Sequence, residues 1–193
     1  MAASPAINPG SGRRAQILAV AAELFARHGF HGVSIADLGA AVGVSGPALY
    51  RHFPSKEALL AEMLVGISEH LLAGGQARAA AASSDPLRVL AELVDFQVDF
   101  ALREPELIVV QDRDLANLPA EARRLVRQLQ RTYVEIWAET LQRVHPGLPA
   151  ESARIAAHGA FGLLNSTPHT GHSPEAAALL RGMAMTALTG LGA

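Results

Sequence analysis

Hydrophobic and polar residues recur with a helical period near the start of the chain. From Gly12 onward apolar residues return every three or four positions, which predicts a helix that ends at the HGF sequence of residues 28–30. Gly29 then stands just after the last turn, where glycine is favoured. The apolar stripe of this helix consists of Ile17, Val20, Ala21, Leu24 and Phe25.

Two shorter helices are expected next. Ser34 has the position of an N-cap, with Asp37 three residues later, and Gly43 ends the pattern. Ser45 is a second expected N-cap, and Pro47 falls in the first turn of a very short helix, where a missing N–H costs nothing. The three helices are each too small to be stable alone. We expect one shared core of Ile17, Leu24, Phe25, Ile35, Leu38, Val42, Val44, Leu49 and Phe53.

The pair of short helices joined by VGVS has the size of a helix-turn-helix, with the small Gly39 where the two helices must nearly touch. After a Pro-Ser break, a long helix is predicted from Lys56 to about Ala79. Further helices are predicted at 86–103, 105–117, 120–144, 150–166 and 174–190. The fold class is therefore all-α, divided into a disordered arm (1–11), a helix-turn-helix domain (12–57) and a helical ligand-binding and dimerisation domain (58–193), with a linker at 79–86.

Composition narrows the class of protein. Half of the 193 residues are hydrophobic, and only 5% are aromatic, which suits close-packed helices. The chain has no cysteine, so disulfides and thiolate metal sites are excluded. We expect no signal peptide and no membrane span, because residues 1–11 have no basic start and charges interrupt each apolar run. These features predict a cytoplasmic protein.

Charge is distributed unevenly along the chain. The formal net charge is −2, but residues 1–56 carry five basic groups against two acidic ones, a balance of +3. Residues 57–193 carry eleven basic against sixteen acidic groups, a balance of −5. A basic end on an acidic body suits a phosphate-binding surface in the first segment.

Three stretches carry a resemblance to a known family: RRAQILAVAAELFARHGF, SIADLGAAVGVSGPALYRHF and PSKEALLAEML, within residues 12–60. They resemble the DNA-binding module of the TetR (tetracycline-repressor-like) family of bacterial transcription regulators. The resemblance covers about a quarter of the chain. It implies a helix-turn-helix that binds duplex DNA, followed by a helical body that binds a ligand and forms a homodimer.

The second helix of a helix-turn-helix enters the major groove with its N-terminal end. Here that end consists of Ser45, Gly46, Pro47 and Ala48, which are small and allow close approach to bases. Arg51 is a candidate for a guanine edge. The resemblance implies phosphate contacts for Tyr50 and His52. Lys56 and Ser34 stand at helix N-termini that favour phosphate, and Arg13 or Arg14 is a further candidate contact.

Other roles remain open for several of these residues. Tyr50 is also suited to packing against Phe53, His52 to a capping role, and Arg51 to a solvated face. Gly46-Pro47 departs from the Lys-Gly pair common in the family, which removes one charge from the expected groove-facing end.

Polar residues among apolar helices suggest a ligand site in the body. The candidates are Gln97, Gln111, Arg127, Arg131, Tyr133 and Trp137. Arginines beside aromatic residues suit an elongated anionic or acyl-type ligand, whereas the alternative is that these polar side chains face water. The helices near 153–166 and 176–193 are rich in small and apolar residues, which favours a two-fold homodimer through about 150–190; a buried core role is the alternative.

Other chemistry finds little support. His169 and His172 in a Gly/Ser/Thr loop have loose spacing for zinc, and we expect no metal and no cofactor. Asp112 and Asp114 are two residues apart and diverge on a helix, so no acid–base pair is expected and the chain is not predicted to be an enzyme. The prediction is a DNA-binding repressor released from a palindromic operator by a small-molecule inducer. The alternatives are a regulator without an inducer and a helical protein-interaction module.

Overall fold

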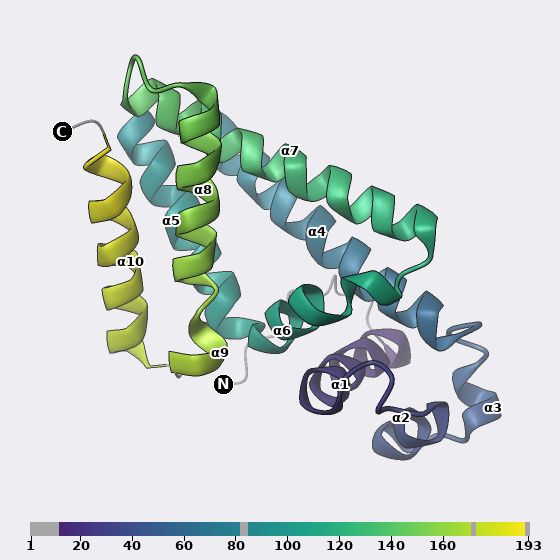
Figure 1. Ribbon diagram of the computed structural model, residues 1–193. Coiled ribbons are helices and arrows are strands. Elements are labelled where there is room, and N and C mark those ends of the chain that lie inside the picture. Colours follow the sequence, from purple (N-terminus) through teal and green to yellow (C-terminus); the bar gives the residue numbers. More distant parts are fainter. Residues whose placement is uncertain (1–11, 82–84, 171–172, 192–193) are drawn as a thin grey trace. The chain divides into compact units, whose positions relative to one another are not determined.

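A computed structural model describes residues 12–81, 85–170 and 173–191, and the regular structure within these ranges is helical (Figure 1). The all-α prediction is confirmed. The elements in order are α1 (Arg13–His28), α2 (Ile35–Val42), α3 (Gly46–Leu49), α4 (Lys56–Ala81), α5 (Pro86–Arg103), α6 (Pro105–Asp114), the 3-10 helix η1 (Leu115–Asn117), α7 (Ala120–Val144), α8 (Ala150–Leu164), α9 (Thr167–Thr170) and α10 (Pro174–Thr189). The predicted disordered arm (1–11) and the centre of the predicted linker (82–84) lie outside the described residues.

The chain forms two compact units, and each combines two separate stretches of sequence. Unit 1 contains the residues up to His70 together with Glu106–Arg127. Unit 2 contains Leu71–Pro105 and Gln128–Ala193. These units are defined by packing and do not follow the predicted functional division after residue 57, which stays a prediction.

The core of unit 1 is built around α1, α2 and α3, with α1 packed on α2 and α2 packed on α3. Six of the nine residues predicted for this core are buried: Ile17, Phe25, Leu38, Val42, Leu49 and Phe53. Leu24, Ile35 and Val44 are only half-buried, because α2 and α3 have eight and four residues and cover little neighbouring surface.

Local sequence signals set the ends of the first helices. Gly29 follows α1 with a φ of 79°, and its N–H donates to the carbonyl of Phe25. Gly43 ends α2 in the left-handed conformation, with a φ of 70°, which a residue with a side chain rarely adopts. Ser55 accepts a hydrogen bond from the Ala58 N–H at 3.0 Å and so caps the start of α4.

Unit 2 contains a packed group of three helices, in which α10 contacts α5 and α8 and α5 contacts α8 (Figure 1). The start of α5 is fixed by Asp85, which accepts a hydrogen bond from the Leu87 N–H, and by Pro86 in the first turn. Trp137 of α7 is fully buried. Its ring centroid lies 4.9 Å from that of Phe161 of α8, and this contact joins α7 to the group.

The break predicted at 166–175 contains a short helix that the sequence analysis missed. Thr167 begins α9 and is fully buried, and its hydroxyl donates to the Ala101 carbonyl at 2.6 Å. This contact with α5 orders a stretch whose composition is that of a loop.

One described helix, α4, is long and apolar enough by length and composition to cross a membrane. Of its most apolar window, 44% is buried inside the protein. The core helix of a globular protein gives the same signal. The charges that interrupt the apolar runs of the sequence do not keep α4 from meeting this criterion.

Candidate nucleic-acid interface

The helix-turn-helix of unit 1 depends on a close approach at Gly39. A Cβ atom at this position would lie 2.7 Å from the Val44 carbonyl oxygen, so any side chain here would force α2 away from the turn that leads to α3. The Val44 N–H also donates to the Gly39 carbonyl at 2.8 Å. The turn is therefore held by backbone contacts for which only glycine is small enough.

Ser34 and Asp37 form a capping box at the start of α2. The Asp37 N–H donates to the Ser34 hydroxyl oxygen at 3.1 Å, and the Asp37 carboxylate accepts from the Ser34 N–H at 2.8 Å and from its hydroxyl at 2.6 Å. These bonds hold the pKa of Asp37 below its ordinary value. The Ser34 hydroxyl is thus already engaged, although its side chain is exposed.

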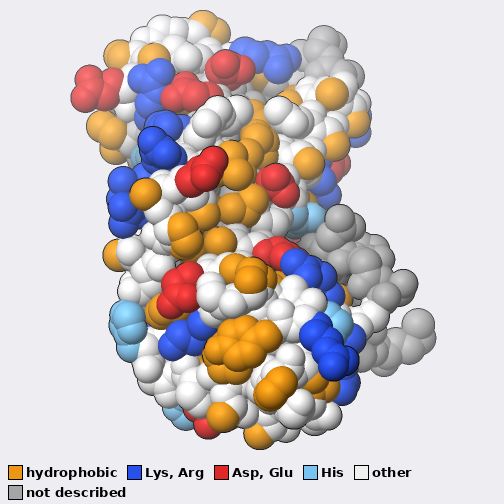
Figure 2. Space-filling view, turned by 90° about the vertical axis from the view of Figure 1, so that its right-hand side faces the viewer, with side chains coloured by type: hydrophobic (Ala, Val, Ile, Leu, Met, Phe, Trp, Pro, Cys, Tyr) orange, Lys and Arg blue, Asp and Glu red, His pale blue; other side chains and the backbone are white. Residues whose placement is uncertain are grey.

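The residues that follow Gly43 place a mixed surface around α3. Ser45 and Pro47 are exposed, Tyr50 is 52% exposed, and Arg51 is exposed. Gly46, Ala48 and His52 are half-buried, whereas Leu49 and Phe53 point into the core. Figure 2 shows hydrophobic side chains (orange) next to Lys and Arg (blue) in its lower part, on the side where α3 lies in Figure 1.

Backbone hydrogen bonds extend the helical turns beyond α3. The N–H groups of Tyr50, His52 and Phe53 donate to the carbonyls of Gly46 and Leu49 at 2.9–3.2 Å. Tyr50, Arg51 and His52 therefore have fixed backbones directly after the short helix. Tyr50 is 52% exposed, so the alternative that it is half-buried against Phe53 stays open.

The two arginines at the start of α1 have different surroundings. Arg13 is exposed, donates to the Gln16 side chain at 2.9 Å, and reaches the Gly43 carbonyl at 3.5 Å. Arg14 forms an ion pair with Glu62, donates to the His52 carbonyl, and lies over the Phe53 ring, 4.3 Å from its centroid. Arg14 is therefore exposed but engaged in contacts within unit 1, whereas the described contacts of Arg13 are fewer.

The Lys56 ammonium group binds backbone carbonyls of unit 1, in contrast to the simple phosphate contact expected from the sequence. Its ammonium group donates to the Phe30 carbonyl at 2.7 Å and to the Val33 carbonyl at 2.8 Å. The same group lies 4.3 Å from the centroid of the Phe30 ring. Two of its three N–H groups thus bind the loop between α1 and α2.

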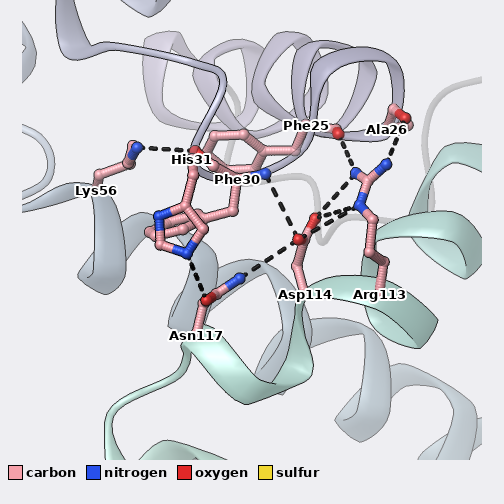
Figure 3. Close-up of polar contacts among 8 residues, drawn as sticks. All are labelled: Phe25, Ala26, Phe30, His31, Lys56, Arg113, Asp114 and Asn117. Atoms are coloured by element: carbon pink, nitrogen blue, oxygen red, sulfur yellow. Dashed lines mark hydrogen bonds and ion pairs between the residues drawn. The ribbon is translucent and has the colours of Figure 1, made fainter.

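A second polar cluster joins α6 and η1 to the end of α1 (Figure 3). The Arg113 guanidinium donates to the carbonyls of Phe25 and Ala26 in the last turn of α1, and the Phe25 carbonyl also accepts from the Gly29 N–H. The guanidinium also pairs with Asp114 at 3.0 Å, whose side chain is only 5% exposed. A positive charge at the C-terminal end of α1 is favoured by the helix dipole as well as by these bonds.

Asp114 and Asn117 extend this cluster to the loop after α1. The Asp114 carboxylate accepts from the Phe30 N–H at 3.5 Å and from the Asn117 amide at 3.3 Å, and Asn117 is bonded to the His31 ring at 2.9 Å (Figure 3). A role of these residues at the end of α1 is not predicted from the sequence. The available signal was the run QDRDLAN, whose polar residues are too dense for an ordinary exposed helix end.

The predicted ligand residues separate into two groups. Gln97, Tyr133 and Trp137 belong to unit 2 and are buried together: the Tyr133 hydroxyl donates to Gln97 at 3.0 Å, and the Tyr133 and Trp137 ring centroids are 6.3 Å apart. Gln111 and Arg127 belong to unit 1. Arg131 is in unit 2 but is exposed. The two predicted arginines are therefore not part of the buried cluster.

The structure adds residues to this cluster that the sequence did not single out. The Gln97 amide donates to Asn165 at 2.8 Å, and the Phe161 ring stacks on Tyr133 with centroids 5.5 Å apart. Arg78 lies over the Phe96 ring at 3.9 Å. Small and apolar side chains are also exposed on α8 and α10, where Ile155 is 66% exposed and Leu179 64% exposed.

Among the described residues, no group of three or more His, Asp or Glu side chains is placed to hold a metal ion. Of the two histidines considered for zinc, His169 is exposed and His172 lies outside the described residues.

A helix-turn-helix unit and an all-helical second unit define a class of DNA-binding regulators, and comparison with known proteins identifies the family. The model of the bacterial regulatory proteins of the tetR family matches residues 17–63. The model of the tetracyclin repressor-like C-terminal domain matches residues 83–169. The chain belongs to the TetR family of transcriptional regulators. Membership in a family of regulators confirms the expectation that the chain is not an enzyme.

Curated relatives agree with this assignment. The chain is 29% identical over 133 residues to the HTH-type transcriptional repressor KstR2 of Rhodococcus jostii, which covers 68% of this chain and 65% of the repressor. It is 33% identical over 136 residues to the nucleoid occlusion factor SlmA of Shewanella halifaxensis, which covers 70% of this chain and 66% of that protein. The chain thus spans about two thirds or less of the length of these relatives.

Solved structures show the same fold. A TetR-family transcriptional regulator from Bordetella parapertussis has a TM-score of 0.82 at 26% identity, covering 92% of this chain and 95% of that one. The regulator PfmR from Thermus thermophilus has a TM-score of 0.78 at 27% identity, covering 92% of this chain and 100% of that one.

Proposed function

We propose that the chain is a ligand-responsive transcriptional repressor that binds a palindromic operator as a homodimer. The observation that carries this proposal is the accessible surface formed by Ser45, Pro47, Tyr50 and Arg51 in a helix-turn-helix whose turn is fixed at Gly39. Because bacterial DNA lies in the cytoplasm, this function also places the protein there.

Each residue of the surface has a proposed contact. Ser45, Gly46, Pro47 and Ala48 would approach base edges, with Pro47 and Ala48 against thymine methyl groups and Arg51 at a guanine. Tyr50 and His52 would donate to phosphates, together with the exposed Arg13. The third N–H of Lys56 is a further phosphate donor in this proposal, since its other two bind carbonyls inside unit 1. Ser34 donates both its hydroxyl and its backbone N–H to Asp37, so it contacts a phosphate only if it gives up one of these bonds.

The proposed homodimer forms through α8 and α10. Exposed apolar residues Ile155, Leu179 and Met183 lie on these helices among exposed glycines. Burial of such residues in a two-fold helix bundle removes apolar surface from water. Two recognition helices related by that symmetry would bind half-sites about 34–36 Å apart on one face of the DNA.

A ligand would act through differential affinity for two states of the protein. The chain offers a covalent route for this effect. α5 ends at Arg103 and α6 begins at Pro105, and the other end of α6 carries Arg113, which binds the last carbonyls of α1. A shift of α6 that accompanies ligand binding would therefore pull on α1 and disturb the helix-turn-helix.

Repression is favoured over activation by the extent of the matches. The match to the KstR2 repressor covers 68% of the chain and includes residues outside the helix-turn-helix, whereas the match to the transcriptional activator FasR of Mycolicibacterium smegmatis covers 34%. The sequence predicts an elongated ligand that is either anionic or of acyl type. We retain the acyl-type ligand, because the buried cluster is aromatic. The anionic ligand loses its support, since Arg127 and Arg131 do not belong to that cluster.

The proposed function is tested by fluorescence anisotropy with duplex DNA from the region upstream of the gene, over a series of salt concentrations. Wild-type protein should bind one upstream segment more tightly than scrambled DNA. Tyr50→Phe should weaken binding to both DNAs by a few-fold, through one lost phosphate bond, while Arg51→Ala should reduce the preference for the operator.

Arg88→Ala is the matched control, because Arg88 is an exposed arginine on α5 in unit 2. It should leave operator binding unchanged. The protein-interaction module would be supported instead if the protein bound duplex DNA no more tightly than heparin and if the Tyr50 and Arg51 substitutions had no effect.

A further inference from the structure

The buried interior of unit 2 contains a chain of hydrogen bonds that links three helices. The Tyr133 hydroxyl of α7 donates to Gln97 of α5 at 3.0 Å, and the Gln97 amide donates to Asn165, which follows α8, at 2.8 Å. Gln97 is 2% exposed and Tyr133 is 5% exposed. Burial raises the pKa of Tyr133, so its hydroxyl keeps its proton at any physiological pH.

One polar group beside these hydrogen bonds has no hydrogen-bond partner of its own among the described residues. The Trp137 side chain is fully buried, and its Nε1–H makes no hydrogen bond to any described residue. The indole stands edge-on to the Tyr133 ring, with an interplanar angle of 80°, and its interaction with the Tyr133 hydroxyl lowers the pKa of that group against the larger effect of burial. A buried donor that lacks a well-aligned acceptor destabilises the protein, because it has lost its hydrogen bond to water. Buried Trp residues usually find a partner for this group.

Aromatic rings pack closely against two glycines of α4 in this unit. A Cβ atom on Gly74 of α4 would lie 2.1 Å from the Phe96 ring, and one on Gly75 would lie 2.6 Å from the Tyr133 ring. The rings of Phe161 and Tyr133 stack at an interplanar angle of 20°. The surroundings of Trp137 are therefore apolar, with a small number of oriented polar groups, as in binding sites for small molecules.

The cluster reaches the surface at α8. Phe161 and Asn165 lie one helical turn apart, and both are half-buried, in contrast to Trp137 behind them. Arg78 is the charged side chain that the described contacts bring nearest, but its guanidinium donates to the Gly74 carbonyl and lies over Phe96. The half-buried edge of the cluster thus presents an aromatic ring and a neutral amide.

We propose that this cluster binds the uncharged carbonyl oxygen of an apolar molecule, and that Trp137 Nε1–H donates to that oxygen. A carbonyl oxygen supplies the missing acceptor and brings no charge into the interior. A carboxylate would supply an acceptor too, but an unpaired buried charge is far more costly than a neutral group. The ligand class is therefore a ketone, ester or thioester in which any charged part lies outside the cluster.

This inference rests on one part of the proposed function, the binding of a ligand by unit 2, and it names the chemical class of that ligand. It can be tested without DNA. Trp137 is the single tryptophan of the chain, so tryptophan emission reports on this site alone. The probes are methyl nonyl ketone, undecanol and undecanoate, titrated into the full-length protein at pH 8, where undecanoate is ionised.

The ketone should move the emission of Trp137 to longer wavelength and raise the melting temperature. Undecanoate should bind at least tenfold more weakly. Trp137→Phe should weaken ketone binding about tenfold, measured by the thermal shift, since it removes the donor and keeps an aromatic ring. Phe161→Leu is the control for packing and should weaken the ketone and the alcohol alike.

Undecanoate binding as tight as the ketone would overturn the proposal, and so would unchanged ketone affinity in Trp137→Phe or the absence of any ketone response in the wild-type protein. Because no DNA is present, failure here leaves operator binding untouched. Failure of operator binding likewise leaves the emission result standing.

Discussion

The Lys56 ammonium group makes two contacts with Phe30: it donates to the Phe30 carbonyl at 2.7 Å, and it lies 4.3 Å from the centroid of the Phe30 ring. Phe30 is 3% exposed and follows the end of α1, whereas Lys56 begins α4. The single lysine of this chain therefore fastens the loop between α1 and α2 onto α4. A compact ammonium with three donors suits two convergent carbonyls better than a planar guanidinium does.

Lys56→Gln should lower the melting temperature by several degrees. The substitution leaves the carbonyls of Phe30 and Val33 without their donor, which costs about 1–3 kcal/mol. Circular dichroism melting measures this effect. Arg51→Gln is the matched control, since it removes one charge from the same unit at an exposed position and should leave the melting temperature unchanged.

The salt dependence of DNA binding examines the second proposed role of Lys56. If its third N–H contacts a phosphate, Lys56→Gln should reduce the slope of log affinity against log salt by about one. An unchanged slope would restrict Lys56 to the structural role. Equal melting temperatures of the Lys56→Gln and Arg51→Gln variants would contradict that structural role.

Asp114→Asn should destabilise unit 1, whereas Asp112→Asn should have little effect. Asp114 is buried and faces Arg113, the Phe30 N–H and Asn117, so loss of its charge weakens the cluster that caps α1. Asp112 is exposed on the same helix. We expect a loss of about 1–3 kcal/mol for Asp114→Asn in urea unfolding. Similar losses in both variants would show that helix charge, rather than this cluster, is responsible.

Ile155→Glu and Leu179→Glu should each convert the dimer into a monomer. A charge placed at the centre of an apolar helix interface cannot be solvated when the two copies associate. Analytical ultracentrifugation measures the mass. Leu87→Glu is the control, because Leu87 is 49% exposed at the start of α5, outside the proposed interface. A wild-type chain that sediments as a monomer at micromolar concentration would contradict the dimer.

Acid should weaken α2 through Asp37. Hydrogen bonds from Ser34 lower the pKa of Asp37 in the folded protein, so this carboxylate contributes stability that is fully present above its unfolded pKa of about 4. That contribution is lost as the pH falls through the lower folded pKa. Ser34→Ala should therefore lower the melting temperature at pH 7 and make it less sensitive to pH below 4. An equal pH dependence in wild type and Ser34→Ala would contradict this assignment.

Much of the helical fold could be predicted from the sequence because helix ends depend on nearby residues. Pro86 and Pro174 mark helix starts at the predicted positions, and the Ser34 capping box and the left-handed Gly43 bound α2 as expected. Predictions were less accurate where several end conformations compete. The predicted helix at 105–117 is α6 followed by the 3-10 helix η1, and the one predicted to reach 166 ends at Leu164.

The sites were harder to predict, because their contacts join residues that are far apart in the chain. Lys56 bonds to carbonyls 23 and 26 residues earlier, and Arg113 bonds to carbonyls 87 and 88 residues earlier. No local pattern encodes such pairs. The buried positions of Gln97, Tyr133 and Trp137 could be anticipated from polar residues within apolar helices. The exposure of Arg131 agrees with the alternative that the charged side chains face water, but periodicity alone does not decide between the two, since it does not show which helix face a neighbour covers.

The two-segment construction of unit 1 determines how its DNA-binding part can be exchanged between relatives. Residues 106–127 supply Arg113 and Asp114, which complete the end of α1, so a transplant of only the first 60 or so residues leaves these carbonyls dependent on a foreign α6. Hybrid regulators built with a single crossover should therefore fold poorly unless the new α6 offers an equivalent arginine. A design with two crossovers, which moves both segments together, keeps the native partners and is the rational choice for rewiring operator specificity.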